Sequence, residues 1–120
     1  MPENDLPEAP LIAARAAESK KAIDVRILDL RAISSFTEYF VVCSGANARQ
    51  IQAIADEIGM QLKDQGHRAL GVEGYEKAEW LLADYGSFIV HVFSTEARAF
   101  YDIERLWRAA KEVKIPANVS

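Results

Sequence analysis

A chain of 120 residues with a net charge of −4 is long enough to form one domain with its own hydrophobic core. Half of its residues are hydrophobic, but no run approaches the roughly 18 apolar residues of a membrane span, and the acidic, proline-containing N-terminus is unlike a signal peptide. Direct binding to bare nucleic acid is also disfavoured, because the sequence shows no dense basic cluster. The single cysteine, Cys43, fits a reducing cytoplasm.

The first part of the chain predicts a tail, a helix and two strands. Residues 1–10 mix prolines with acids, which is typical of a flexible tail. The Ala-rich stretch from Leu11 to about Lys21 predicts a short helix at the domain edge. Alternating apolar and charged residues from Ile23 to Leu30 predict a first strand. The run from Tyr39 to Ser44 is apolar almost throughout and predicts a central strand, which Gly45 ends.

The clearest helix begins at Asn47. Gln50 follows three residues later, which is the spacing of a capping box, and Gly66 is placed as a C-terminal cap. Gly59 in the interior costs about 1 kcal/mol relative to Ala, so we expect close packing there. The face that should be buried is formed by Ile51, Ile54, Ala55, Ile58 and Leu62.

The next segment predicts a third strand around His67–Glu73 and then a hairpin. Its arms are Trp80–Asp84 and Phe88–Phe93, with Gly86 providing the positive φ of a tight turn. The second arm is apolar on both faces, so we expect it in the middle of the sheet. The first arm begins with a large aromatic residue and is expected at the sheet margin.

A last helix is predicted from about Thr95 to Glu112. Its core face would contain Phe100, Ile103, Leu106, Trp107 and Ala110. Ala97 and Tyr101 widen that face enough for contact with another molecule. Together the elements predict an α/β fold with a single mixed β-sheet of about five strands and packed helices. We expect one domain over residues 11–113 and a flexible tail at 114–120.

Catalytic and metal-binding patterns are weak in this sequence. His67, His91 and Cys43 do not have the spacing of metal ligands, and His91 between two valines on a strand is more simply a structural histidine. The turn after Cys43 is neither a nucleophile elbow nor a Gly-rich phosphate loop. We therefore predict no catalytic residues, no metal and no cofactor.

The loop from Glu73 to Asp84 carries four acids against one cation, Lys77, and three aromatic residues, Tyr75, Trp80 and Tyr85, lie in or next to it. Such a run is commonly a solvated loop. Aromatic residues among charges are also typical of protein interfaces, in which the charges at the rim steer the partner. Composition alone leaves both interpretations open.

Several segments, in order, resemble the ribosomal silencing factor family, also called the RsfS or Iojap-like family. They are Asp29-Leu30, Thr37 to Gly45, Glu73-Gly74, Trp80 to Gly86, Val90 to Phe93 and Glu96 to Trp107. The run Trp-x-x-x-Asp-Tyr-Gly followed by Val-His-Val and Arg-x-Phe-Tyr is specific in combination. One departure is Glu38, where the family more often has Asp.

The resemblance implies a cytoplasmic translation repressor that binds ribosomal protein fourteen of the large subunit and sterically blocks joining of the two subunits. It also implies a homodimer when free, with no sequence-specific nucleic-acid binding and no membrane contact. The family's fold is similar to that of nucleotidyltransferases, whose enzymes carry Gly-Ser followed by Asp-x-Asp. Here the order is Ser44-Gly45 and no Asp-x-Asp occurs, so we expect no enzyme. The alternative is a degenerate nucleotidyltransferase-like enzyme or nucleotide-binding protein.

The resemblance also implies a contact region on the hairpin. Its expected centre is Trp80, Leu81, Asp84 and Tyr85. Its expected rim is Glu79 and Lys77. Second choices are His91, Arg98 and Tyr101, which could equally hold the hairpin against the last helix.

Overall fold

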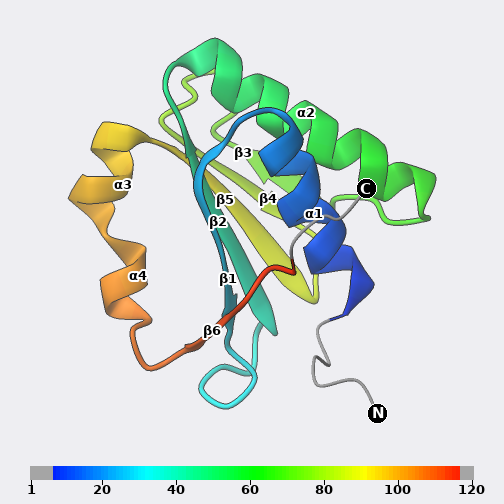
Figure 1. Cartoon of the computed structure of the whole chain (residues 1–120), viewed down its shortest axis with the longest axis vertical. Coiled ribbons are helices and arrows are strands. Elements are labelled where there is room, and N and C mark those ends of the chain that lie inside the picture. The colour runs from blue at the N-terminus through cyan, green and yellow to red at the C-terminus, as the bar shows by residue number, and fades with distance from the viewer. Residues whose placement is uncertain (1–6, 117–120) are drawn as a thin grey trace.

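One six-stranded mixed sheet carries helices on both faces in the computed structural model, which describes residues 7–116 (Figure 1). In chain order the elements are α1 (Glu8–Ser19), β1 (Ile23–Asp29), β2 (Tyr39–Gly45), α2 (Ala48–Asp64), β3 (Gly71–Glu73), β4 (Trp80–Asp84), β5 (Phe88–Ser94), α3 (Thr95–Tyr101), α4 (Ile103–Leu106) and β6 (Lys111–Val113). The predicted α/β class with a single mixed sheet is confirmed, with six strands instead of about five. Most of both predicted tails lies outside the described residues.

The strands lie in the order β3-β4-β5-β2-β1-β6, and among the described strands only β2 and β5 pair in parallel. Every residue of β2 is buried, and β5 is buried on both faces apart from partial exposure at Ile89 and Ser94. Both strands are therefore central, as their apolar sequences predict. β4 is not at the margin, because the three residues of β3 form the edge beside it. This third strand is shorter than the predicted range His67–Glu73.

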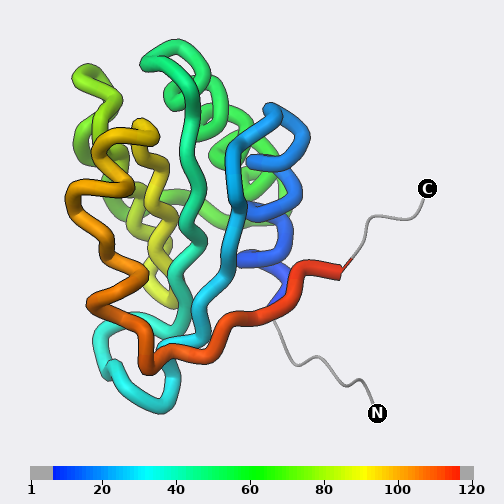
Figure 2. Tube along the Cα trace, turned by 60° about the vertical axis from the view of Figure 1, so that its left-hand side comes forward, coloured from blue at the N-terminus to red at the C-terminus, as the bar shows by residue number. Residues whose placement is uncertain are grey.

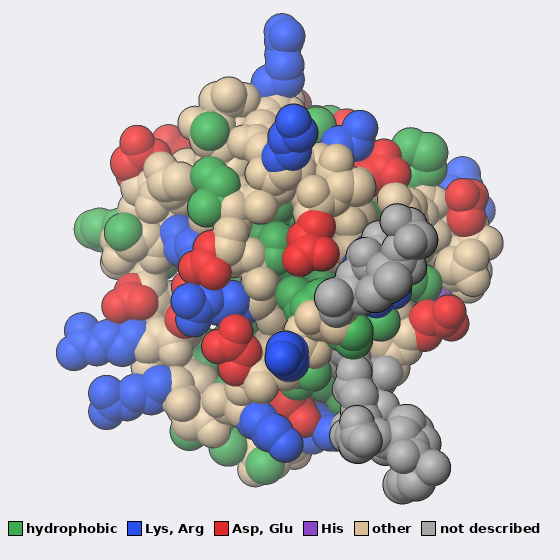
Figure 3. Space-filling view, in the orientation of Figure 1, with side chains coloured by type: hydrophobic (Ala, Val, Ile, Leu, Met, Phe, Trp, Pro, Cys, Tyr) green, Lys and Arg blue, Asp and Glu red, His purple; other side chains and the backbone are tan. Residues whose placement is uncertain are grey.

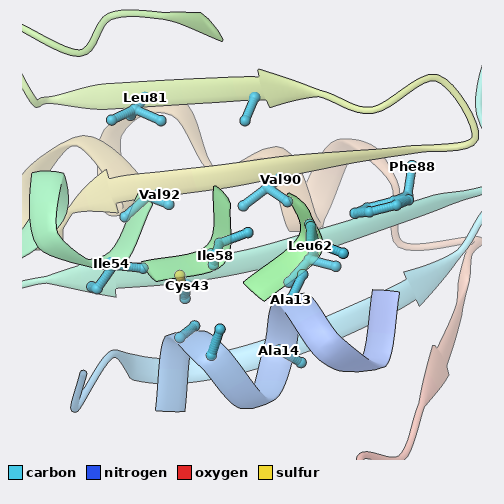
Figure 4. Packing of buried hydrophobic residues seen from close by; sticks show 14 of the residues in the cluster. Ala13, Ala14, Cys43, Ile54, Ile58, Leu62, Leu81, Phe88, Val90 and Val92 are labelled. Atoms are coloured by element: carbon cyan, nitrogen blue, oxygen red, sulfur yellow. The ribbon is translucent and has the colours of Figure 1, made fainter. Parts of the chain in front are cut away.

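The helices α1 and α2 cover one face of the sheet and pack against each other (Figure 1). Four alanines of α1 are fully buried, and their small side chains let this helix approach its neighbours closely. Figure 4 shows Ala13 and Ala14 on α1 and Ile58 and Leu62 on α2, with both helices in front of the strands. The helix begins at Glu8, three residues earlier than predicted, and is a full part of the core.

The start of α2 has the predicted cap. Asn47 Oδ1 accepts a hydrogen bond from Gln50 N (2.8 Å), and Gln50 Oε1 accepts one from Ala46 N (2.6 Å). The expectation of close packing at Gly59 is wrong, because an added Cβ would approach nothing closer than Tyr85 Oη at 3.9 Å. This glycine instead borders an open groove between α2 and the β3–β4 edge.

The opposite face is covered in part by α3 and α4, over a second apolar cluster that includes Leu28, Phe40, Phe93 and Ile103. The single helix predicted for Thr95–Glu112 is wrong. The helix is interrupted at Asp102, whose backbone has a left-handed conformation (φ 49°, ψ 50°). Phe100 and Leu106, predicted in the helix core, are 80% and 77% exposed.

The predicted last turn of that helix is strand β6, which pairs with the outer edge of β1 through Ile27↔Val113 and Asp29↔Lys111. Pairing gives the β1 edge hydrogen-bond partners, which a continuing helix could not. Figure 2 shows this segment running from α4 across β1 toward α1. There, Arg15 donates to the Pro116 carbonyl oxygen (3.4 Å). In residues 7–116 no helix combines the length and apolar character that crossing a membrane requires.

Candidate protein-binding face

Alternation along β4 divides the predicted contact residues between the two faces of the sheet. Leu81 and Ala83 are buried on the side of α1 and α2, whereas Trp80, Leu82 and Asp84 are partly exposed on the other side. Leu81, predicted at the centre of the interface, is fully buried and unavailable to a partner. Leu82 takes its place on the open side, and the two-residue period of a strand links it to Trp80.

The open side of the sheet carries an aromatic cluster. The Trp80 ring packs on Tyr101 and Phe93, with centroid distances of 4.7 Å and 5.1 Å. Phe100 meets Tyr101 edge-on at 5.0 Å. Tyr101 is 47% exposed and Phe100 is 80% exposed. The cluster therefore packs on the sheet through Trp80 and Phe93 and is open to solvent at Phe100 and Tyr101. We call Trp80, Leu82, Phe100 and Tyr101 the aromatic face.

His91 lies beneath the aromatic face and is only 4% exposed. Its Nδ1 accepts a hydrogen bond from Trp80 Nε1 (3.0 Å), and its ring meets Phe40 edge-on at 4.5 Å. Burial lowers the pKa of His91 to about 4, so the ring is neutral near pH 7 with its proton on Nε2. The buried histidine positions the tryptophan from below and presents no surface of its own.

Arg98 also acts within the fold. Its guanidinium makes a two-point contact with the Glu104 carboxylate (2.9 and 3.0 Å). The third nitrogen donates to Ser44 Oγ (3.1 Å) and to the Ile23 carbonyl oxygen (3.2 Å). These contacts tie α3 to α4, β1 and β2, so Arg98 has a structural role, but it acts through these elements and not through the hairpin as the alternative supposed.

The turn of the hairpin orients Asp84 and Tyr85 differently. Asp84 Oδ1 accepts a hydrogen bond from Gly86 N (2.8 Å), and Gly86 has the predicted positive φ of 86°. Tyr85 stacks flat on Phe88 at 5.0 Å and lines the groove beside α2, where burial raises its pKa. Asp84 therefore lies with Trp80 on the open side, while Tyr85 faces the other side.

The acidic loop is fixed to α2 by its aromatic residue. Tyr75 Oη donates to the Asp56 carboxylate (3.1 Å), and the Tyr75 carbonyl oxygen accepts from Gln52 Nε2 (2.9 Å). Gly74 has a φ of 78°, and a side chain there would collide with the Trp80 carbonyl oxygen. The loop is therefore a shaped connection, and Tyr75 is not part of the aromatic face.

Acidic side chains border the aromatic face. Glu79 and Glu96 line one hollow together with Phe100 and Tyr101, and both glutamates are exposed. Lys77 is exposed in the preceding turn, one position before the buried Ala78. Sequence reasoning missed Glu96, Leu82 and Phe100. The strand period could have found Leu82, but Phe100 is exposed only because the chain breaks at Asp102.

The other chemical candidates have structural roles. The Cys43 thiol is fully buried, and burial raises its pKa to about 12, so it is a poor nucleophile. Ser44 is buried and accepts from Arg98. In the described part of the chain, no three or more His, Cys, Asp or Glu side chains gather in a group that could hold a metal ion.

With this fold and face in place, the comparisons with known proteins identify the family. A family model described as "Ribosomal silencing factor during starvation" matches residues 3–120, and the chain belongs to that family. It is 38% identical to the ribosomal silencing factor RsfS of Halalkalibacterium halodurans over 109 residues, which cover 91% of this chain and 93% of the relative. Identity to the Bacillus subtilis factor is 42% over 96 residues, covering 80% and 81%.

A solved structure agrees with the fold. The crystal structure of a protein from Chromobacterium violaceum superimposes with a TM-score of 0.82 at 33% identity and covers 92% of each chain. The resemblance deduced from the sequence motifs is therefore confirmed.

Proposed function

We propose that this chain represses translation by docking on ribosomal protein fourteen of the large subunit through the aromatic face. The docked protein then occupies space that the small subunit needs, so the two subunits cannot join. Family membership supports the silencing role. Steric exclusion requires only binding, with no reaction and no cofactor.

The aromatic face is the observation that carries this proposal. Exposed aromatic side chains that are supported from below act as anchors in protein interfaces. Phe100 and Tyr101 have this arrangement, because Tyr101 rests on Trp80 and Trp80 is held by His91. The exposed Glu79 and Glu96 beside them suit a basic partner such as a ribosomal protein.

The test is a double substitution, Phe100→Ala with Tyr101→Ala, in which binding and stability are measured on the same protein. We expect its affinity for purified large subunits to fall by at least about 30-fold, since truncation of an anchor commonly costs about 2 kcal/mol or more. The thermal midpoint should change little, because both side chains are exposed.

Met60→Ala is the matched control. Met60 is an exposed hydrophobic residue of α2, on the other side of the sheet, and its truncation should leave binding unchanged. A subunit-joining assay then links binding to function, and the double variant should no longer prevent joining. If the double variant binds large subunits as tightly as the wild type, the proposal is wrong.

A further inference from the structure

Basic side chains recur every three residues after α3. Arg105, Arg108, Lys111 and Lys114 are all exposed, in a chain whose net charge is −4. Arg105 belongs to α4, and the other three follow along the segment that leads into and beyond β6. In Figure 3, basic side chains project from the margin at which Figure 1 places α4 and the chain that follows it.

Two nearby carboxylates, those of Glu104 and Glu112, are engaged by other arginines, whereas Asp102 lines the same hollow as Arg105 and Arg108. Glu104 is held by Arg98 at 2.9 Å and lies 3.6 Å from Arg26. Arg26 also contacts Asp24 (3.1 Å) and Glu112 (3.7 Å). In residues 7–116, neither Arg105 nor Arg108 forms an ion pair or a side-chain hydrogen bond within the chain. Their positive charges are therefore available to a partner.

Arg105 and Arg108 adjoin the aromatic face. They line the same hollow as Phe100, Tyr101 and Leu106. The opposite side of the aromatic pair is bordered by Glu79 and Glu96. One continuous surface thus has an acidic side, an aromatic centre and a basic side, which matches a basic protein that lies next to a polyanion.

We propose that Arg105 and Arg108 bind backbone phosphates of ribosomal RNA beside the protein on which the aromatic face docks. This inference rests on the proposed function. Guanidinium groups suit the site, because they bind phosphate oxygens with two parallel hydrogen bonds. Such contacts orient a protein on RNA without reading its sequence.

The phosphate contacts act only in addition to protein docking. A protein of net charge −4 with two such arginines is a poor ligand for bare RNA. Once the aromatic face is bound, the arginines meet nearby phosphates at a high effective concentration. We therefore expect no measurable capture of protein-free ribosomal RNA.

The experiment compares the salt dependence of binding to purified large subunits between the wild type and the double variant Arg105→Gln, Arg108→Gln. Each phosphate contact contributes about 0.7 to 0.9 to the slope of log affinity against log salt. Loss of two contacts should reduce the slope by about 1.5, so over a fourfold rise in salt the wild type loses about eightfold more affinity than the variant.

The variant Lys63→Gln, Arg68→Gln is the control, since it removes the same charge from exposed residues that line the groove beside α2. Its slope should match that of the wild type. Isolated ribosomal protein fourteen is the second probe, and it should bind the wild type and the Arg105, Arg108 variant equally.

Three outcomes would overturn the inference. An unchanged slope would show that these arginines meet no phosphate. An equal loss of affinity for isolated ribosomal protein fourteen would assign them to an acidic protein surface instead. A wild type that binds neither probe would remove the proposed function together with this inference, whereas normal docking with an unchanged slope removes the inference alone.

Discussion

Trp80 serves both the fold and the predicted interface. Its ring is partly exposed beside Tyr101, while its indole nitrogen donates to the buried His91 at 3.0 Å. A charged residue at this position would therefore disturb the core as well as the surface. Trp80 is for this reason a poor test of binding by itself, and the more exposed Phe100 and Tyr101 are better ones.

Trp80→Phe isolates the internal role of the indole nitrogen. The phenyl ring keeps most of the packing, but it leaves His91 Nδ1 buried without a donor. An unsatisfied buried acceptor costs about 1 to 3 kcal/mol, so we expect the free energy of unfolding to fall by that amount in urea titrations. A double-mutant cycle with His91→Phe should show coupling between the two positions. Additive effects would contradict the role assigned to this hydrogen bond.

The protonation of His91 should make stability depend on pH. The pKa of His91 is about 4 in the folded protein and about 6.5 when unfolded, so between these values the unfolded chain binds the proton and the folded protein does not. Stability is therefore full above pH 6.5 and falls as the pH drops toward 4, by up to about 1.4 kcal/mol per pH unit.

Urea unfolding at pH 7, 6 and 5 measures this dependence. His91→Asn removes the titrating group, so the variant should be less stable at pH 7 but should lose much less stability between pH 6.5 and 4. Asp29 forms a salt bridge with Arg31 and has a lowered pKa. Its effect on the pH dependence of stability therefore falls below the pH range in which His91 titrates. An identical pH profile in the variant would show that His91 does not titrate as described.

At the scale of elements, the two-residue period of β4 determines which side chains reach the surface more than the residue types do. Trp80 through Tyr85 looks like one acidic, aromatic surface in the sequence, yet the pleat sends Leu81 to the core and Tyr85 to the α2 side. The two-residue alternation is visible in the sequence and could have separated Leu81 from Leu82. The direction of Tyr85 depends on how the turn packs against Phe88, which no local pattern specifies.

We expect Ala substitutions at Gly59 and Gly45 to change the melting temperature in opposite directions. Gly59→Ala replaces a poor helix former inside α2 where the nearest atom is 3.9 Å from the new Cβ. We expect a gain of about 1 kcal/mol and a rise in melting temperature of about 4 °C. Gly45→Ala should instead lower it, because its Cβ would lie 2.8 Å from Ile51 Cγ1.

Calorimetry on the two variants gives the comparison directly. A loss of stability in Gly59→Ala would mean that the groove beside α2 closes more tightly in solution than the structure shows. Gly45→Ala tests the effect of packing at a position where the added Cβ has no room.

The last helix shows where sequence periodicity fails. Apolar residues at helical spacing continue from Ala97 to Ala110. The helix is nevertheless interrupted at Asp102, and the segment that follows α4 leads into strand β6. The break keeps Arg98 within reach of Glu104, and β6 covers the open edge of β1. The pairing of β6 with β1 joins segments far apart in the chain, so a local window does not contain it.

At the scale of the molecule, the central strands and the capped helix α2 were predictable because their patterns are local and strong. The two layers of helices, and the side of the sheet that stays open, follow from long-range packing. The distribution of positive and negative charge around the aromatic face also had to come from the structure. The sequence shows scattered cations, whereas the fold gathers Arg105 and Arg108 beside Phe100 and leaves Glu79 and Glu96 on its other side.

We expect the free protein to form a concentration-dependent dimer. Phe100 and Leu106 are large apolar side chains that are 80% and 77% exposed on neighbouring helices. Burying them against a second copy would remove apolar area from water. Sedimentation should show a rise in mass with concentration that Leu106→Ser weakens and Leu70→Ser, equally exposed near β3, does not. A monomer at every concentration would contradict this expectation.

The position of the two tryptophans has a practical consequence for following these events. Trp80 and Trp107 both pack on the second apolar cluster, on the side of the sheet away from α1 and α2. Indole emission therefore originates from one side of the molecule alone. A shift of the emission maximum on mixing with a partner would report that side without an attached dye, while a ligand in the groove beside α2 would leave the spectrum unchanged.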